Sequence, residues 1–359
     1  MQCFLTNYPD HHRQMAMITC CMRALEWGFV QKPLWRLPVK DLRPAGPYPG
    51  DAIEHPNGHA NGHANELTKQ KFEQSPTVTQ AMWDAFDLIF NLRGYGWNWT
   101  KNWYFPTETR STTSTPSFLM STLFSACKYY IIFDLCLTTA RVISPPDASK
   151  LTGGSIFDPS LPPALYYTIP CILTLICGMT VCASIQLIYD VLTIISVVVL
   201  QQHPVQWPPI ADHPWLSTSL TLCWSKRWHQ LFRSSFIGVG ARPLSWLFGR
   251  VGGVVGAFFW SAILHDWGMW GLGHGTEFSH VGGFFLMMGV GCIMETLFKK
   301  VTGVKVRGLA GWVWTMCWMI GWGIPMIDAW TRRGLLANKF VPEEYMIGHF
   351  ILRFGSNPL

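Results

Sequence analysis

Residues 164–200 form an apolar stretch that is far longer than the roughly 20 residues a transmembrane helix requires. In hydrocarbon, every backbone N–H and C=O group must find a partner within the protein, so only α-helices and closed barrels span a bilayer. An uninterrupted apolar run of this length predicts helix, and two arrangements satisfy it. The stretch is either one long tilted helix bent near Pro170 or two helices in a tight hairpin.

Further apolar segments indicate a polytopic membrane protein. They cover residues 15–30, 118–142, 251–272, 281–298, 309–327 and 345–354, of which the first and last are weak. The composition agrees, because 13% of the 359 residues are charged and 49% are hydrophobic, whereas soluble proteins average about 25% charged residues. We therefore predict an all-α fold, a polytopic transmembrane helical bundle of about six to eight membrane segments.

Two segments are expected at the membrane interface. Residues 77–92 are amphipathic, with Met82, Phe86, Ile89 and Phe90 at helical spacing, which is typical of a helix lying on the membrane surface. Residues 215–248 mix apolar and basic side chains and are expected to be interfacial or re-entrant.

The chain divides at about residue 75. Residues 1–75 hold the weak first segment, which contains Arg23 and Glu26, and a polar Gly/His/Pro-rich loop; residues 76–359 form the membrane domain. The loop carries the tandem NGHANGHA, and the spacing of His55, His59 and His63 is compatible with a metal site. Low complexity favours a flexible solvated insertion instead. The 11 Cys are scattered without a C-x-x-C pair, so neither a disulfide framework nor a zinc site is expected.

Loop charge predicts the topology. Basic residues cluster at 32–71, 226–250 and 299–307, whereas 144–163 carries few. The positive-inside rule places the three basic loops in the cytosol and the loop at 144–163 in the lumen. These assignments agree with one another only if residues 164–200 cross once, which favours a single long helix. The basic residues of the cytosolic loops thus account for the net charge of +6. Because no basic stripe with interleaved aromatics is present, no nucleic-acid partner is expected.

Three clusters could carry chemistry. The first is RGYGWNW at 93–99, directly after the amphipathic segment. Its two glycines permit positive φ and close backbone approach. A turn that anchors the surface helix is favoured over a direct catalytic role.

The second cluster is WSKRWHQLFR at 224–233. On a helix, Lys226, His229 and Arg233 would fall near one face. Basic groups beside aromatics suit a phosphorylated, adenine-bearing cofactor. They suit anchoring to anionic lipid headgroups equally well, and the spacing alone does not choose.

The third cluster centres on His265, an ionisable residue inside the apolar segment 251–272. Such residues are costly in hydrocarbon and usually functional. A neutral imidazole suits removal of a proton from a hydroxyl that attacks an acyl group. Asp266 would point about 100° away on a helix and cannot simply orient that ring. The functional interpretation is favoured over a structural histidine.

In this order and on these segments, the three clusters resemble the fungal wax-synthase-like branch of the membrane-bound O-acyltransferase superfamily. Within it, the likeness is greatest to O-acetyltransferases of terpenoid and meroterpenoid pathways. Residues 93–99 resemble the family's R-G-x-G-W-N-W block, residues 224–233 its F-W-x-R-W-H block, and residues 261–266 the segment ending in its membrane histidine. The chain departs from the pattern at Asp266, where many relatives have Glu, and at Cys223, where an aromatic is usual. Relatives also often carry more N-terminal spans.

The resemblance implies an integral, multi-pass enzyme, expected in the endoplasmic reticulum. Its co-substrate would be acyl-CoA, in particular acetyl-CoA, with no permanently bound cofactor and no metal, and its acceptor would be an apolar alcohol. His265 would be the catalytic base, and His229 would stabilise the oxyanion or orient the thioester. The donor would be bound by Lys226, Arg227, Trp228 and Arg233.

Two alternatives remain open. A fatty acyltransferase acting on long-chain alcohols, a wax synthase, is the nearest enzymatic one. An inactive membrane scaffold or a transporter is the alternative of another class, although a transporter predicts internal repeats, which the sequence does not contain. The oligomeric state is not predicted.

Overall fold

The computed structural model describes residues 9–28, 33–39, 42, 77–100, 103–271, 275–338 and 341–348. The longer helices are α1 (Pro9–Gly28), α3 (Val78–Phe90), α4 (Thr115–Ile143), α5 (Pro163–Val198), α8 (Arg242–Met269), α9 (Phe278–Thr302) and α10 (Gly308–Arg332). Two helical turns, α6 (Leu220–Leu222) and α7 (Arg233–Ser235), are each followed by a π-helical turn, Cys223–Arg227 and Phe236–Ala241. No strand occurs in these described ranges, where the one β-type contact is the isolated bridge between Arg36 and Trp97. The all-α prediction is confirmed. The His-rich loop lies outside the described residues, as does most of 345–354.

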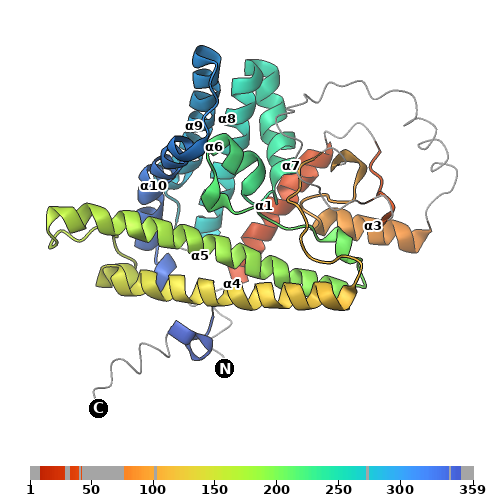
Figure 1. Cartoon of the computed structure of the whole chain (residues 1–359), viewed down its shortest axis with the longest axis horizontal. Helices are drawn as coiled ribbons and strands as arrows, with labels where there is room; N and C mark the ends of the chain where they lie inside the picture. Colours follow the sequence, from red (N-terminus) through yellow and green to blue (C-terminus); the bar gives the residue numbers. More distant parts are fainter. Residues whose placement is uncertain are drawn as a thin grey trace.

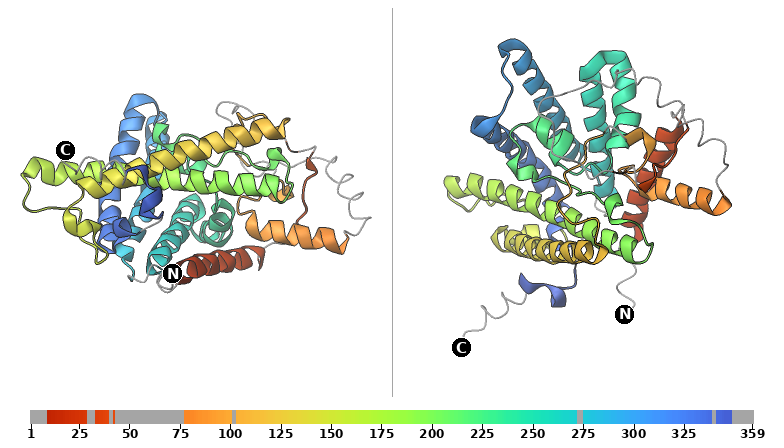
Figure 2. Two further views of the ribbon diagram at one scale, coloured as in Figure 1. Left: turned by 90° about the horizontal axis from the view of Figure 1, so that it is seen from below. Right: turned by 45° about the vertical axis from the view of Figure 1, so that its right-hand side comes forward.

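Helices α4 and α5 run side by side across one end of the molecule (Figures 1 and 2). α5 is one continuous helix of 36 residues that passes through Pro170, so the single-helix prediction is confirmed. The Thr174 hydroxyl donates to the Pro170 carbonyl at 2.8 Å. At about 1.5 Å per residue, α5 is about 54 Å long. Since the hydrocarbon core is roughly 30 Å thick, α5 must tilt strongly or extend beyond it.

α8 contains a reverse turn. Phe248 and Gly249 leave helical geometry, and Gly249 has φ +61°, which favours glycine. The chain therefore forms a helical hairpin, seen standing above α5 in Figure 2. A Cβ on Gly240 would lie 2.3 Å from the Gly256 carbonyl oxygen, so glycines allow the two arms to pack closely. The boundary expected from the sequence, between the interfacial segment 215–248 and the apolar segment 251–272, is thus the tip of this hairpin.

Four helical stretches are long and apolar enough to cross a membrane: Thr115–Ile143, Pro163–Val198, Arg233–Met269 and Phe278–Thr302. They support an integral membrane protein. This number, for the part of the chain that is described, is lower than the six to eight expected. The predicted span 309–327 lies in α10, which has 25 residues like α9 but contains five Trp where α9 has none.

α1 is held against the bundle by Arg23 and Glu26, the two charged residues that made residues 15–30 a weak candidate for a membrane segment. Arg23 and Glu26 are buried and form an ion pair at 3.2 Å. Arg23 also donates to the Ser234 hydroxyl at 3.1 Å, and the Ser235 hydroxyl donates to Glu26 at 2.9 Å. Buried charges are tolerated when paired and hydrogen-bonded, so these contacts dock α1 onto α7.

α3 has no buried residue, and Met82, Phe86, Ile89 and Phe90 are all exposed. The predicted apolar stripe is therefore free for a lipid surface. The Thr77 hydroxyl caps its start by accepting from the N–H of Gln80 at 3.3 Å.

The loop assigned to the lumen lies beside the start of α9 and the end of α10. Asp328 of α10 accepts hydrogen bonds from the Ser155 hydroxyl at 2.7 Å and from the Ile156 N–H at 2.9 Å. Arg332 pairs with Glu277, which directly precedes α9. The loop at 144–163, the start of α9 and the end of α10 thus share one end of the bundle, as the loop charges require. The main apolar core lies among α4, α5, α8, α9 and α10.

Candidate functional site

His265 lies on α8 with one ring nitrogen engaged. Its Nδ1 is 2.8 Å from the Ser261 carbonyl oxygen. Because a carbonyl oxygen only accepts hydrogen bonds, we assign the ring proton to Nδ1, and Nε2 then carries the lone pair. The ring stacks on Phe285 of α9, with centroids 4.0 Å apart. The sequence places this histidine in an apolar segment, and the fold gives it the tautomer of a proton acceptor at Nε2.

A continuous set of rings joins His265 to His229. Trp224 lies 6.3 Å from Phe285 and 5.6 Å from Trp228, and Trp228 lies 5.0 Å from His229, all between ring centroids. The second and third sequence clusters therefore meet in one aromatic cluster, which we define as His265, Phe285, Trp224, Trp228 and His229.

Two polar atoms of the aromatic cluster are buried without a hydrogen-bond partner in the described part of the chain, Nδ1 of His229 and Nε1 of Trp224. A buried polar group left unpaired costs about 1–3 kcal/mol, and such groups often mark a ligand site. Burial, followed by electrostatic coupling to His265 and to the Arg93 guanidinium, lowers the pKa of His229 to about 3. His229 is therefore neutral near pH 7, and its unpaired nitrogen is available to a substrate.

Residues 224–233 do not form the continuous helix on which Lys226, His229 and Arg233 would share a face. The π-turn ends at Arg227, and Trp228 is extended, with φ −71° and ψ 155°. The side-chain amide of Gln230 donates to the carbonyls of Trp224 at 3.1 Å and Trp228 at 2.7 Å. These bonds satisfy the carbonyls freed where the helix stops. Gln230, which sequence reasoning passed over, thus fixes the bend.

The basic residues of this cluster do not share a helical face. Lys226 lies over the Tyr104 ring at 5.9 Å and Arg233 over the Trp103 ring at 5.0 Å. They approach neighbouring aromatic residues, within the range of cation–π attraction. Arg227 points elsewhere, toward the Asp212 carboxylate at 3.9 Å.

A cavity of about 60 Å³ adjoins Trp228 and His229. Its other walls come from α4, α5 and the loop at 210–215, namely Tyr129, Cys182, Ile185, Gln186, Ile210, Ala211, His213, Pro214 and Trp215. The cavity has room for a few water molecules. It lies between Trp228 and His229 on one side and the α4–α5 pair on the other.

The first sequence cluster holds the residues that directly precede the cavity-lining loop. Arg93 is buried and donates to the Tyr189 hydroxyl at 3.0 Å and to the carbonyls of Pro208 and Pro209, each at 2.8 Å. A Cβ on Gly94 would lie 2.1 Å from the Trp99 ring, so only glycine fits there. The cluster is a structural anchor, as favoured, although it anchors the 207–209 loop as well as α3.

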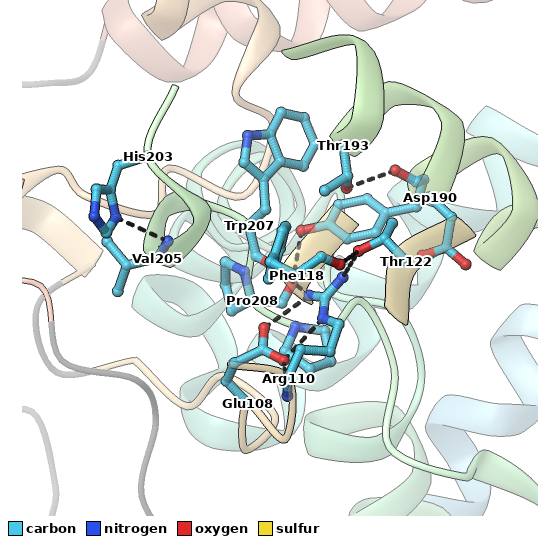
Figure 3. Close-up of polar contacts among 12 residues, drawn as sticks. Glu108, Arg110, Phe118, Thr122, Asp190, Thr193, His203, Val205, Trp207 and Pro208 are labelled. Atoms are coloured by element: carbon cyan, nitrogen blue, oxygen red, sulfur yellow. Dashed lines mark hydrogen bonds and ion pairs between the residues drawn. The ribbon is translucent and has the colours of Figure 1, made fainter. Parts of the chain in front are cut away.

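A second arginine, missed in the sequence, grips the same loop. Figure 3 shows Arg110 between Glu108 and Thr122, beside Trp207 and Pro208. Its guanidinium contacts the Glu108 carboxylate at 2.7 Å, the Thr122 hydroxyl at 3.0 Å and the Trp207 carbonyl at 2.7 Å. Two arginines thus bind three consecutive carbonyls, those of residues 207, 208 and 209. No local pattern around residue 110 signals this role.

Comparisons with known proteins indicate an O-acyltransferase. Residues 207–287 match the membrane bound O-acyl transferase family, a segment that includes the whole aromatic cluster. The chain is also 27% identical over 331 residues to acetyltransferase TRI7 of Fusarium sporotrichioides, covering 80% of this chain and 74% of that protein. The resemblance predicted from the three clusters is confirmed.

Proposed function

We propose that this membrane-bound O-acyltransferase transfers an acetyl group from acetyl-CoA to the hydroxyl of an apolar terpenoid or meroterpenoid acceptor. The observation that carries the proposal is the aromatic cluster, in which Nε2 of His265 is free to accept a proton and Nδ1 of His229 is buried without a partner. The similarity to a fungal acetyltransferase supports acetyl as the group transferred.

The chemistry follows from these two histidines. Nε2 of His265 takes the proton of the acceptor hydroxyl as its oxygen attacks the thioester carbonyl. The carbon–sulfur bond then breaks, and the imidazolium returns the proton to the thiolate, so that the ester and free CoA leave. During the attack, His229 donates to the carbonyl oxygen or orients the thioester. The Trp224 indole N–H is a second unpaired buried donor in the same cluster.

The donor is bound on the side of the second sequence cluster. We propose that Lys226, Arg227 and Arg233 meet the phosphates of CoA and that Trp228 packs against its acyl-bearing arm. The ring contacts of Lys226 and Arg233 support this assignment, because basic groups beside aromatic rings suit a phosphorylated, adenine-bearing donor. The acceptor arrives laterally from the lipid, and the proposed compartment is the endoplasmic reticulum.

The test uses microsomes that carry the wild-type chain or His265→Ala. They receive radiolabelled acetyl-CoA or palmitoyl-CoA with a panel of terpenoid and long-chain alcohols. We expect acetyl ester from the wild type and a loss of about 10²- to 10⁴-fold in the variant, the usual contribution of a general base. His280→Ala is the matched control, because this histidine contacts Glu277 outside the aromatic cluster. We expect this variant to retain wild-type turnover.

Each other outcome contradicts part of the proposal. Ester formed from palmitoyl-CoA alone would favour the wax synthase. Turnover retained by His265→Ala would remove this residue from the mechanism. No transfer by correctly inserted wild-type protein with any pair would favour an inactive scaffold.

A further inference from the structure

A carboxylate outside the aromatic cluster is buried in the apolar bundle. Glu295 lies on α9 and is 7% exposed. Its Oε1 accepts hydrogen bonds from the N–H of Leu220 at 2.6 Å and from the indole N–H of Trp314 at 3.0 Å. Its Oε2 accepts from the N–H of Thr221 at 2.9 Å. Three donors from two other segments thus converge on this side chain, which the proposed reaction does not use.

Two of these donors belong to the segment that delivers the second sequence cluster. Leu220 and Thr221 begin α6, which is three residues long and continues into the π-turn Cys223–Arg227. The first N–H groups of a helix have no partner within it, so Glu295 acts as their acceptor. Such a short helical piece has little stability of its own. Its position therefore depends on contacts with the rest of the bundle.

The approach of this segment to α9 is close and specific. A Cβ on Gly291, one helical turn before Glu295, would lie 2.3 Å from Cδ1 of Leu220. Leu220 is fully buried. Further along the same segment, Trp224 reaches Phe285, the residue on which His265 stacks. α9 therefore holds the segment at Glu295 and meets it again at Phe285.

We propose that Glu295 is a positioning residue for the acyl transfer. It fixes the start of residues 220–229, and through them the distance and direction of Trp224 and His229 relative to His265. The inference rests on the proposed function, because it concerns the alignment of that same reaction. Bonds to both carboxylate oxygens fix the direction of the segment as well as its distance. Misplacing reacting groups by about 1 Å can lower a rate about 100-fold.

The experiment compares Glu295→Gln with Asp134→Asn in purified, detergent-solubilised enzyme, with acetyl-CoA and the alcohol that the wild type acetylates. Asp134 is also buried and accepts a backbone N–H, that of Gly348 at 2.8 Å, but it lies outside residues 220–229 and their contacts. In Glu295→Gln, an amide N–H₂ faces a donor, so at least one bond to the segment is lost. We expect kcat to fall about 10- to 100-fold with the KM for the alcohol unchanged. Asp134→Asn keeps the wild-type kcat at a similar thermal stability.

A third variant keeps the test decisive if Glu295→Gln does not fold. Glu295→Asp keeps both acceptor oxygens, and we expect it to fold and to lose less of kcat than the glutamine variant. A kcat within twofold of wild type in folded Glu295→Gln, or no loss in Glu295→Asp when the glutamine variant is unfolded, would overturn the positioning role. An equal fall of kcat in Asp134→Asn would reduce Glu295 to a general stability effect. Absence of transfer by the wild type would instead overturn the proposed function itself.

Discussion

Acidification should destabilise this protein through His229. Burial, with electrostatic coupling to His265 and Arg93, lowers the pKa of His229 from 6.5 to about 3 in the folded protein. In the unfolded chain the imidazole is solvated and keeps its ordinary pKa, so between these two values the unfolded state binds more protons. Stability is unaffected above about pH 6.5 and is lost as the pH falls toward 3. Between about pH 7.5 and pH 5, this single group lowers the free energy of unfolding by about 2 kcal/mol.

The assay is reversible unfolding in mixed micelles with rising SDS, at both pH values, for wild type and His229→Gln. Glutamine is polar and similar in size but does not titrate. We expect the wild type to lose about 2 kcal/mol more than the variant on acidification, because every other group is common to both. Equal pH dependence in the two proteins would mean that His229 already protonates readily in the fold. The claim that it is neutral and open to substrate would then be wrong.

Two further substitutions test the packing around the site, with the same unfolding assay. A lysine at position 93 cannot reach all three acceptors that the Arg93 guanidinium binds. With two bonds from a charged donor lost, at about 1.5–3 kcal/mol each, Arg93→Lys should lower the free energy of unfolding by about 3 kcal/mol or more. An unchanged unfolding midpoint would refute the anchoring role. Gly291→Ala introduces a Cβ 2.3 Å from Leu220, and this overpacking should lower the free energy of unfolding by about 1–3 kcal/mol. Wild-type stability in this variant would show that α6 does not pack as tightly against α9 as described.

The parts of the fold predicted well are those that local sequence determines. Pro163–Val198 is one helix, as its apolar run without a cluster of turn-forming residues and the charges of the flanking loops both predicted. At residues 224–233, reasoning from residue spacing alone does not describe the fold. Their helical spacing is real, but the side chain of Gln230 takes over two backbone carbonyls and ends the helix at Arg227. Periodicity carries no information about such competition.

The site divides in the same way. His265 stands out because an ionisable residue in an apolar segment is conspicuous without any partner. The roles of Arg110 and Glu295 depend on acceptors and donors that lie 97 and 75 residues away in the chain. The burial of Arg23 and Glu26 could not be predicted for the same reason, since their contacts with each other and with α7 are visible only in three dimensions. Polar contacts between residues far apart in the chain are thus the part of the structure that the sequence did not predict.

The docking of α1 has a consequence for how the chain is made. Arg23 binds Ser234, which is 211 residues further along. At about 5–20 residues per second, the ribosome synthesises the partner roughly 10–40 s after the arginine. During that interval α1 carries two charges whose final burial site does not yet exist. α1 therefore leaves the ribosome well before the segment that receives it, and in the meantime it must stay at the membrane surface or beside the insertion machinery.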